Sequence, residues 1–338
     1  MPRSLPLLDR RQRALSDLRI SVVDRCNFRC SYCMPKQVYG AHFKFLPQAE
    51  LLSFEEIARL ARVFVARGVR KFRLTGGEPL LRRDLSVLVA MLRESSGVEI
   101  ALTTNGSLLE AQAEALARAG LDRLTVSLDA LDDAVFRAMN DVDFPVARVL
   151  AGIAAARAAG LPPANVNAVI RRGVNDHTLV DLAEHFKGTG HVVRFIEFMD
   201  VGHTNGWRLD QVVSGAEIVQ RITRRFPLEP IGRARPNDVA THYRYRDGSG
   251  EIGIVASVTQ PFCGDCTRGR LSTDGKFFTC LFAAQGLDLR AQLRGGATDE
   301  QLATAVAAHW ADRDDHYSER RSQATHAEPR MEMSYLGG

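Results

Sequence analysis

Three of the six cysteines in this chain of 338 residues, Cys26, Cys30 and Cys33, have the spacing C-x3-C-x2-C. Three thiolates on one loop can bind three irons of a cubane, whereas a [4Fe–4S] cluster normally takes four cysteines. The fourth iron is then open, so it can bind a small chelating ligand and deliver electrons to it. Structural zinc is the alternative, but it takes four protein ligands, and no nearby His or Cys completes the set. The spacing therefore favours a [4Fe–4S] cluster with one open iron.

The other three cysteines, Cys263, Cys266 and Cys280, are spaced C-x2-C-x13-C. By spacing alone, this trio could bind structural zinc together with a distant histidine such as His242. The segment TRGR follows Cys266 directly, and its two guanidinium groups are suited to bidentate phosphate binding. An open iron beside such groups could hold a nitrogenous base and a polyphosphate. The second trio therefore predicts another [4Fe–4S] cluster, next to a nucleotide site.

Composition indicates a globular protein of the cytoplasm. Hydrophobic residues make up 45% and charged residues 25%, which excludes a disordered or fibrous chain. The N-terminus lacks the apolar core of a signal peptide, and no apolar run approaches the roughly 20 residues of a membrane span. Thiols stay reduced in the cytosol, so grouped cysteines there usually bind metal. The net charge is only +4, with basic residues spread along the chain, which favours a small anionic substrate and argues against nucleic acid or membrane partners.

Short β-branched runs alternate with helical patterns from residue 18 to about residue 198, as expected of βα units. The six expected strands span residues 18–23, 71–75, 98–103, 123–128, 165–170 and 191–197. Between them we expect helices such as 53–67, where Ser53 and Glu56 form a capping box, and 111–119, which Gly120 ends. A closed barrel needs eight units. The sequence therefore predicts an α/β fold with a partial (βα)6 TIM-type barrel, whose open side takes substrate at the carboxyl ends of the strands.

A smaller C-terminal region, residues 231–338, is expected to follow a barrel of residues 4–230. It is rich in turns and contains an expected strand at 251–258, the second cysteine trio and a closing helix near 299–311. The segment GSGEIG at 248–253 matches the dinucleotide pattern G-x-G-x-x-G. It leads into a strand, not from a strand into a helix, so it predicts a hairpin turn and no dinucleotide site.

The segment DRCNFRCSYCMP, which contains the first trio, resembles the signature loop of the radical S-adenosylmethionine (SAM) superfamily, and RLTGGEPLLR resembles its GGE motif. The resemblance implies a partial (βα)6 barrel whose open iron chelates the amino and carboxylate groups of SAM. It also implies SAM contacts from Tyr32 and Met199 to the adenine, Ser127 to the ribose and Gly77 to the methionine amino group. By residue type alone, Tyr32 and Met199 would be packing residues and Ser127 a turn cap.

The segment PFCGDCTRGRLSTDGKFFTCLF resembles the GTP 3′,8-cyclase family of molybdenum cofactor biosynthesis, and the match extends to the terminal SYLGG. It implies radical SAM cyclisation of GTP to (8S)-3′,8-cyclo-7,8-dihydroguanosine 5′-triphosphate, with two [4Fe–4S] clusters, the second of which binds the guanine through its open iron. The C-terminal Gly337 and Gly338 are implied to reach into the active site and to be needed for the chemistry. The implied GTP contacts are Arg19, Arg73, Thr103, Asn165, Arg268, Gly269 and Arg270. Without the family, surface salt bridges would be the better interpretation of Arg19 and Arg73.

Asn165 departs from the family pattern, which typically has Lys at this position. Loss of that cation weakens one phosphate contact, and Arg171 or Arg172 could compensate for it. The resemblance further implies a homodimer, a cytosolic electron donor and a downstream cyclic pyranopterin monophosphate synthase. Two other functions stay open at this point. One is another radical SAM reaction with an auxiliary cluster, on a related nucleotide or a peptide. The other is an iron–sulfur electron carrier, against which the GGE turn and the barrel pattern argue.

Overall fold

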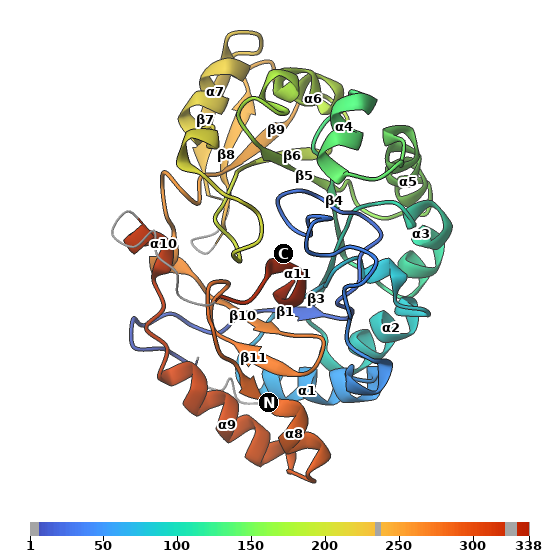
Figure 1. Cartoon of the computed structure of the whole chain (residues 1–338), viewed down its shortest axis with the longest axis vertical. Coiled ribbons are helices and arrows are strands. Elements are labelled where there is room, and N and C mark those ends of the chain that lie inside the picture. The colour runs from blue at the N-terminus through green and yellow to red at the C-terminus, as the bar shows by residue number, and fades with distance from the viewer. Residues whose placement is uncertain (1–6, 234–237, 322–329, 338) are drawn as a thin grey trace.

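The computed structural model describes residues 7–233, 238–321 and 330–337, and one mixed sheet of twelve strands organises them (Figure 1). Its centre consists of six parallel strands that are neighbours in chain order. These are β1 (Asp17–Ser21), β2 (Lys71–Thr75), β3 (Glu99–Thr104), β4 (Arg123–Ser127), β5 (Asn165–Ile170) and β6 (Val192–Glu197). The six expected strands and the expected partial (βα)6 barrel are confirmed.

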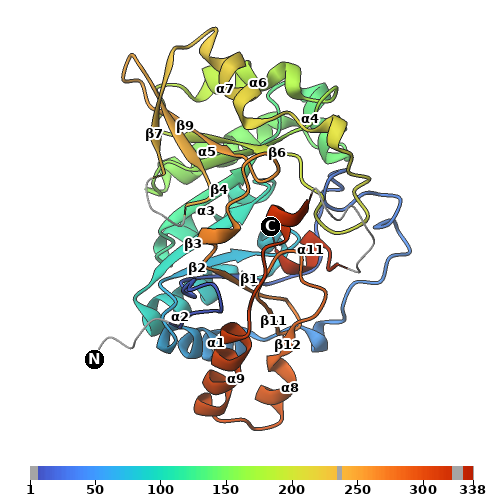
Figure 2. The same cartoon turned by 90° about the vertical axis from the view of Figure 1, so that its left-hand side faces the viewer.

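Helices cover the outer side of the curved sheet (Figures 1 and 2). They are α1 (Phe54–Ala66), α2 (Leu85–Ser96), α3 (Leu109–Arg118), α4 (Asp133–Asn140), α5 (Val146–Ala158), α6 (Leu179–Phe186) and α7 (Gly215–Thr223). The expected capping box begins α1: Ser53 Oγ accepts from Glu56 N at 3.2 Å, and Glu56 Oε2 accepts from Ser53 N at 2.8 Å. This reciprocal pair satisfies two of the backbone donors that a helix leaves unpaired at its start.

Alternating side chains give each central strand two different faces, because successive residues of a strand point to opposite sides. In β1, Leu18 and Ile20 are fully buried in the core beneath the helices. Asp17 and Arg19, which alternate with them, line a cavity on the inner side. The same alternation recurs along β2 and β6. The sheet therefore has an apolar outer face and a charged inner face.

The C-terminal part of the chain extends both edges of this sheet. On one side, β10 (Arg268–Leu271) pairs parallel with β1, and β11 (Lys276–Phe278) and β12 (Leu287–Asp288) follow antiparallel. On the other side, β9 (Glu251–Val255) pairs parallel with β6, followed by β8 (Thr241–Tyr245) and β7 (Leu228–Gly232). The strand at 251–258 is confirmed in shorter form. The proposed domain boundary at 230/231 falls inside β7, within a sheet that is continuous across it.

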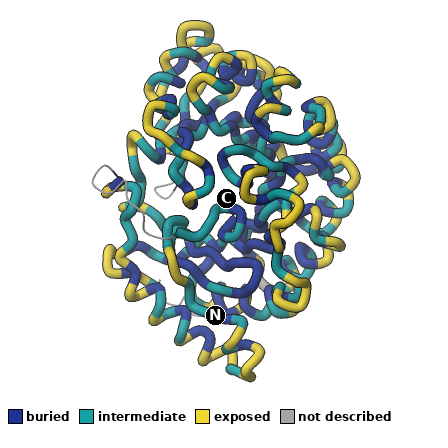
Figure 3. Tube along the Cα trace, in the orientation of Figure 1, coloured by how far each residue is buried: buried dark blue, intermediate teal, exposed yellow. Residues whose placement is uncertain are grey.

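The remaining helices are α8 (Leu289–Arg294), α9 (Asp299–Ala311), α10 (Tyr317–Arg320) and α11 (Met333–Leu336). The closing helix expected near 299–311 is confirmed as α9, which packs on α1. In Figure 1, α11 lies in the middle of the ring of elements, so the C-terminal tail occupies the interior of the partial barrel. Figure 3 shows the buried residues concentrated in the strands and the exposed ones in loops and on helix surfaces.

The segment GSGEIG connects β8 and β9, which pair antiparallel. Gly248 and Gly250 have φ values of +75° and +124°, a region that side chains with a Cβ rarely adopt. The predicted hairpin is confirmed. Among the described residues, no helix combines the length and the apolar character needed to cross a bilayer.

Candidate active site

A cavity of about 860 Å³ opens along the inner face of the sheet, and both cysteine trios line it. The charged residues of the inner face and the tips of the central strands complete its wall. Of the residues implied by the family resemblance, the following line this one cavity: Arg19, Tyr32, Arg73, Gly77, Thr103, Ser127, Asn165, Met199, Arg268 and Arg270. The fold therefore gathers residues as far apart in the sequence as Arg19 and Arg270 around a common space.

The first trio lies on the loop that follows β1. Backbone hydrogen bonds fasten this loop to the end of α4, where Arg29 N donates to Asn140 O at 2.8 Å. Burial raises the pKa of the Cys26 thiol to about 12, and it also raises the pKa of Cys30 and Cys33. Thiols in such surroundings keep their protons at neutral pH, so a metal must displace protons to bind them. The three sulfurs face one cavity, which fits a cluster better than three unrelated structural cysteines.

The GGE turn after β2 packs directly against this cysteine loop. Gly77 N donates to Val23 O at 2.8 Å, and Glu78 N donates to Arg25 O at 2.8 Å. A Cβ on Gly77 would lie 2.2 Å from Arg25 O, and one on Gly76 would lie 2.3 Å from Val23 O. Gly76 also has φ +145°. Only glycine permits this approach, which leaves a backbone cradle beside the first trio.

Glu78 connects the GGE turn to the tip of β3. Its carboxylate accepts hydrogen bonds from Leu80 N at 3.0 Å, Thr104 Oγ1 at 2.6 Å and Asn105 N at 2.7 Å. Burial raises the pKa of Glu78 to about 7, although these donors oppose the shift. Asn105 Nδ2 donates in turn to Cys26 Sγ at 3.7 Å. The cysteine loop, the GGE turn and the TTNG segment thus form one hydrogen-bonded unit.

A buried carboxylate fixes Tyr32, the aromatic residue between the second and third cysteines. Tyr32 Oη donates to Asp129 Oδ2 at 2.8 Å, and Asp129 Oδ1 accepts from Val169 N at 2.9 Å. Burial raises the pKa of Asp129 to about 6. Ser127 and Met199 line the cavity nearby, on the neighbouring strand tips. Asp129 belongs to the SLDAL segment, but the sequence did not predict its hydrogen bond with Tyr32.

The second trio is held by a buried charge cluster near the N-terminus. Asp9 Oδ2 accepts from Arg13 Nε at 2.7 Å and from an Arg313 guanidinium nitrogen at 3.1 Å, and all three side chains are at most 2% exposed. Arg13 also donates to Cys263 O at 2.8 Å, and Arg313 donates to Cys266 O at 2.8 Å. The charge cluster therefore sets the backbone position of two of the three cysteines.

Arginine charges also act on the thiols of the second trio. Burial raises the pKa of Cys266, but Arg268 and Arg313 outweigh it and bring the pKa down to about 6. Burial, together with the charge of Asp315, raises the pKa of Cys280 to about 12. Positive charge beside a thiolate favours metal ligation, because the ligand must be deprotonated.

The described residues contain no group of three or more His, Cys, Asp or Glu side chains arranged around a single ion. The zinc alternatives require such an arrangement, with four ligands at about 2.0–2.3 Å from one ion. In a cubane, by contrast, each cysteine binds a different iron. His242, the distant histidine of the zinc alternative, lies on β8 with its Nδ1 3.0 Å from Glu251 Oε1, and it lines the same cavity as the second trio.

Three arginines lie side by side on the inner face. Parallel register places Arg19 opposite Arg270 on one side and opposite Arg73 on the other. Burial lowers the pKa of Arg19, and the charges of Arg270, Arg268 and Arg73 lower it further. Arg73 donates to Thr103 Oγ1 and Thr125 Oγ1, both at 3.0 Å. Among the described residues neither Arg19 nor Arg73 forms an ion pair, so the salt-bridge interpretation is not supported.

Sequence reasoning missed several cations of this wall, among them Lys71 and Arg194. Burial lowers the pKa of Arg194 to about 10, and its Nε has no hydrogen-bond partner among the described residues. Arg194 lies on β6, next to the strand of Asn165. Neither Arg171 nor Arg172 lines the cavity: Arg171 stacks over Phe198, and Arg172 pairs with Glu217 on the surface. The two strands next to Asn165 carry Arg194 and Arg123, which both line the cavity, so the cations on this side do not come from Arg171 or Arg172. A signal in the sequence could have revealed Lys71. It lies two positions before Arg73 on the same strand, so both side chains point to the same face.

The C-terminal tail packs against residues of the cavity wall. The carbonyl of Gly337 accepts a hydrogen bond from the Arg270 guanidinium. Tyr335 Oη donates to Asp274 Oδ1 at 2.5 Å, and Ser334 Oγ donates to Tyr39 Oη at 3.4 Å. A Cβ on Gly337 would lie 2.2 Å from Thr75 Cγ2. Gly338 lies outside the described residues.

Of the GTP contacts that the family resemblance implies, Gly269 is the one that does not line the cavity. It alternates with Arg268 and Arg270 along β10, and a Cβ there would lie 2.6 Å from the Phe277 ring. Because Gly269 has no side chain, the Phe277 ring can pack against its Cα. Any contact of Gly269 with a ligand would therefore come from its backbone.

Comparison with known proteins assigns each half of the chain to a family, in agreement with the motifs found in the sequence. Residues 20–186 match the radical SAM superfamily, and residues 191–319 match the family described as Molybdenum Cofactor Synthesis C. The chain is 52% identical to the GTP 3′,8-cyclase of Acidothermus cellulolyticus and 47% identical to that of Staphylococcus aureus, covering 98% of this chain and 99% and 98% of theirs. Streptococcus suis SuiB bound to S-adenosylmethionine shares the fold, with a TM-score of 0.61 and 16% identity over 92% of this chain and 69% of SuiB.

Replacing Asp9 with Ala should lower the free energy of unfolding of the cluster-free protein by about 3–5 kcal/mol, because Arg13 and Arg313 would be left buried without a counter-charge. Asp312, which pairs with Arg10 on the surface, provides the control: Asp312→Ala should cost less than about 1 kcal/mol. Urea unfolding followed by circular dichroism measures both. Equal losses in the two variants would contradict the role assigned to the Asp9 cluster.

Proposed function

The chain belongs to the GTP 3′,8-cyclase family of radical SAM enzymes, and we propose that it converts GTP to (8S)-3′,8-cyclo-7,8-dihydroguanosine 5′-triphosphate, the first step of molybdenum cofactor biosynthesis. The observation that carries the proposal is the crowding of buried cations on one wall of the cavity. They are Arg19, Lys71, Arg73, Arg194, Arg268 and Arg270.

These cations destabilise one another. Burial lowers the pKa of Arg19, Arg73 and Arg270, and neighbouring arginines lower the pKa of Arg19 and Arg270 further. Asp17 and Glu99 offset only part of this charge. A polyanion offsets the remainder, and guanidinium groups bind phosphate oxygens in bidentate fashion. A nucleoside triphosphate has both the charge and the length to contact several of them at once.

Members of the radical SAM superfamily use SAM and a [4Fe–4S] cluster. We assign that cluster to Cys26, Cys30 and Cys33, and SAM to the wall beside them. The backbone cradle at Gly77 would hold the methionine amino group, and Tyr32 would contact the adenine. We further propose a second [4Fe–4S] cluster on Cys263, Cys266 and Cys280, because the arginines of β10 lie beside that trio.

Cys26, Cys30 and Cys33 would hold the first cluster beside the SAM wall, and together the two groups would supply the one-electron radical chemistry that links C3′ to C8 of GTP. The chain contributes orientation. Arg19, Arg73 and Arg270 would hold the triphosphate at one level of the sheet, and Thr103 would fix the Arg73 guanidinium through its hydrogen bond. The tail, through Gly337, would close the cavity against water.

Asn165 gives this site one cation fewer than the family pattern, and we assign the missing charge to Arg194 on the adjacent strand. We also propose a homodimer in the cytosol, reduced by a cytosolic electron donor, whose product passes to a cyclic pyranopterin monophosphate synthase.

Anaerobic incubation of the reconstituted protein with SAM, dithionite and GTP tests the proposal by product analysis. We expect 5′-deoxyadenosine together with a cyclised dihydro-GTP product detected by mass spectrometry. 5′-Deoxyadenosine formed with a candidate peptide, and not with GTP, would assign another radical SAM reaction. An iron spectrum unchanged by SAM would favour an electron carrier.

Cys280→Ala should lose one cluster's worth of iron and all GTP cyclisation, yet still cleave SAM at a low uncoupled rate, because the first trio is intact. Iron and sulfide analysis, with 5′-deoxyadenosine measured in parallel, provides the test. Unchanged iron content in this variant would rule out the second cluster. Ser318→Ala, at another residue of the cavity wall, serves as the control and should keep both clusters.

Removing Gly337 and Gly338 should leave both clusters bound and stop product formation, because Arg270 loses the carbonyl that it contacts. Gly337→Ala should act in the same direction, since its Cβ would clash with Thr75. Iron content and product yield are measured together for each variant. Full activity of the shortened chain would exclude a role of the tail.

A further inference from the structure

The segment of residues 25–45, which contains the first trio and the loop that follows it, has two chemically different sides. The side chains that line the cavity are the three cysteines together with Phe28 and Tyr32. None of the basic side chains of this segment lines the cavity. Their charge is therefore not explained by binding of SAM or GTP.

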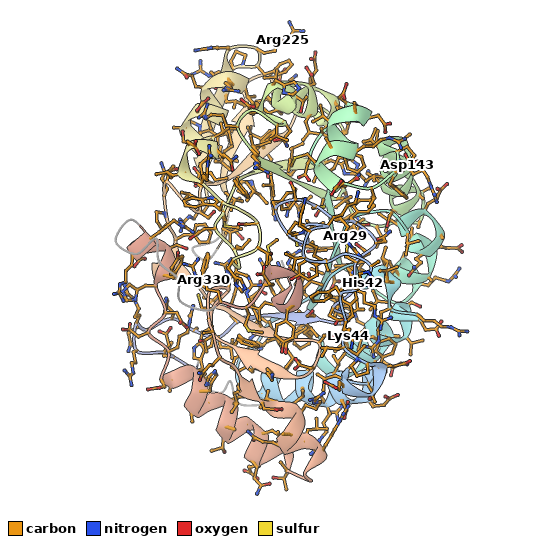
Figure 4. The ribbon with its side chains drawn as sticks, viewed as in Figure 1. Arg29, His42, Lys44, Asp143, Arg225 and Arg330 are labelled. Carbon is orange, nitrogen blue, oxygen red and sulfur yellow. The ribbon has the colours of Figure 1, made fainter. Side chains whose placement is uncertain are left out.

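The outer side carries positive charge only. The segment contains Arg25, Arg29, Lys36 and Lys44, with His42 in addition, and no Asp or Glu. All but the half-buried Arg29 are exposed. Lys36 pairs with Asp141, whereas Arg25 and Lys44 form no ion pair among the described residues. Figure 4 shows His42 and Lys44 on the same part of this loop.

Apolar side chains interrupt this charge. Val38 and Phe43 are 41% and 39% exposed. Phe43 packs between Tyr39 and Phe45, with ring centroids 4.5 and 4.9 Å apart, and the Arg25 guanidinium lies over the Phe45 ring. Exposed aromatic and aliphatic groups within a charged rim are typical of protein–protein contact surfaces.

This outer surface is joined directly to the cysteine loop. The Arg29 side chain donates to Tyr39 O at 2.8 Å and to Cys26 O at 2.7 Å, so one guanidinium bridges the outer loop and the backbone of the first ligand. A protein bound to this surface would therefore lie against the same loop that carries the first trio.

We propose that the outer side of residues 25–45 is the docking surface for an acidic one-electron carrier protein. The proposal rests on the proposed function, in which the first cluster takes one electron from an external donor. In that step the carrier is oxidised by one electron, the cluster is reduced by one electron, and no covalent bond changes. A basic rim attracts an acidic carrier and speeds their encounter at low ionic strength.

The experiment compares two reductants on the reconstituted holoenzyme. One is flavodoxin, an acidic flavin-carrying protein, kept reduced by NADPH and its reductase, and the other is dithionite, which needs no docking surface. The test variant is His42→Glu/Lys44→Glu. The control is Arg224→Glu/Arg225→Glu on exposed residues after α7, which lowers the net charge by more than the test variant does. Figure 4 shows Arg225 at the top edge of the molecule, well away from His42 and Lys44.

At low ionic strength, the test variant should bind flavodoxin about tenfold more weakly in calorimetric titration and lose about tenfold in flavodoxin-driven rate. Its dithionite-driven rate should stay unchanged, and the control variant should match the wild type in all three measurements. Added salt should remove the difference between test variant and wild type.

Equal losses with both reductants would show a structural role of the loop and overturn the proposal, as would equal losses of flavodoxin binding in the test and control variants. Unchanged flavodoxin binding together with lost binding to RNA or anionic vesicles would assign the surface to another partner. A wild type that forms no product from GTP with dithionite would instead refute the proposed function, which separates the two failures.

Discussion

The parallel register of β10, β1 and β2 is the constraint on which the rest of the structure depends. It places Arg270, Arg19 and Arg73 at one level and on one face of the sheet. Buried guanidinium groups repel one another, so this arrangement is costly without an anion and favourable with one. The apolar residues between them, such as Leu18 and Phe72, pack beneath the helices and hold the strands in that register. The fold thus uses core packing to hold like charges together.

Each cysteine trio is positioned by polar contacts that come from elsewhere in the chain. The first depends on the GGE turn, where two glycines let backbone meet backbone and Glu78 ties the turn to the next strand tip. The second depends on Asp9, which neutralises two arginines that hold cysteine carbonyls. Both arrangements fix the protein backbone first, so that the thiols are oriented before a ligand binds.

The C-terminal region and the barrel form a single site, because the sheet continues from β6 into β9 and from β1 into β10. A ligand between the two trios therefore contacts strands from both ends of the chain. The tail adds a third contribution, since its Gly337 carbonyl meets Arg270 in the middle of the partial barrel. The two sides of the cysteine loop differ in chemistry, because its thiols face the cavity and its exposed cations face the solvent.

The sequence by itself determined the six parallel strands, the capping box at Ser53, the hairpin at Gly248 and the membership of the cysteines in two trios, because these depend on local periodicity, turn chemistry and short spacing. It did not reveal Lys71, Arg194, Asp9 or Asp129, and it named Arg171 and Arg172, which do not line the cavity, in place of Arg194, which does. Only the tertiary structure decided these, since strand register and the meeting of residues distant in sequence are set by packing across the whole core. A charged residue in a strand points to the cavity or to solvent according to that register, which no local pattern encodes.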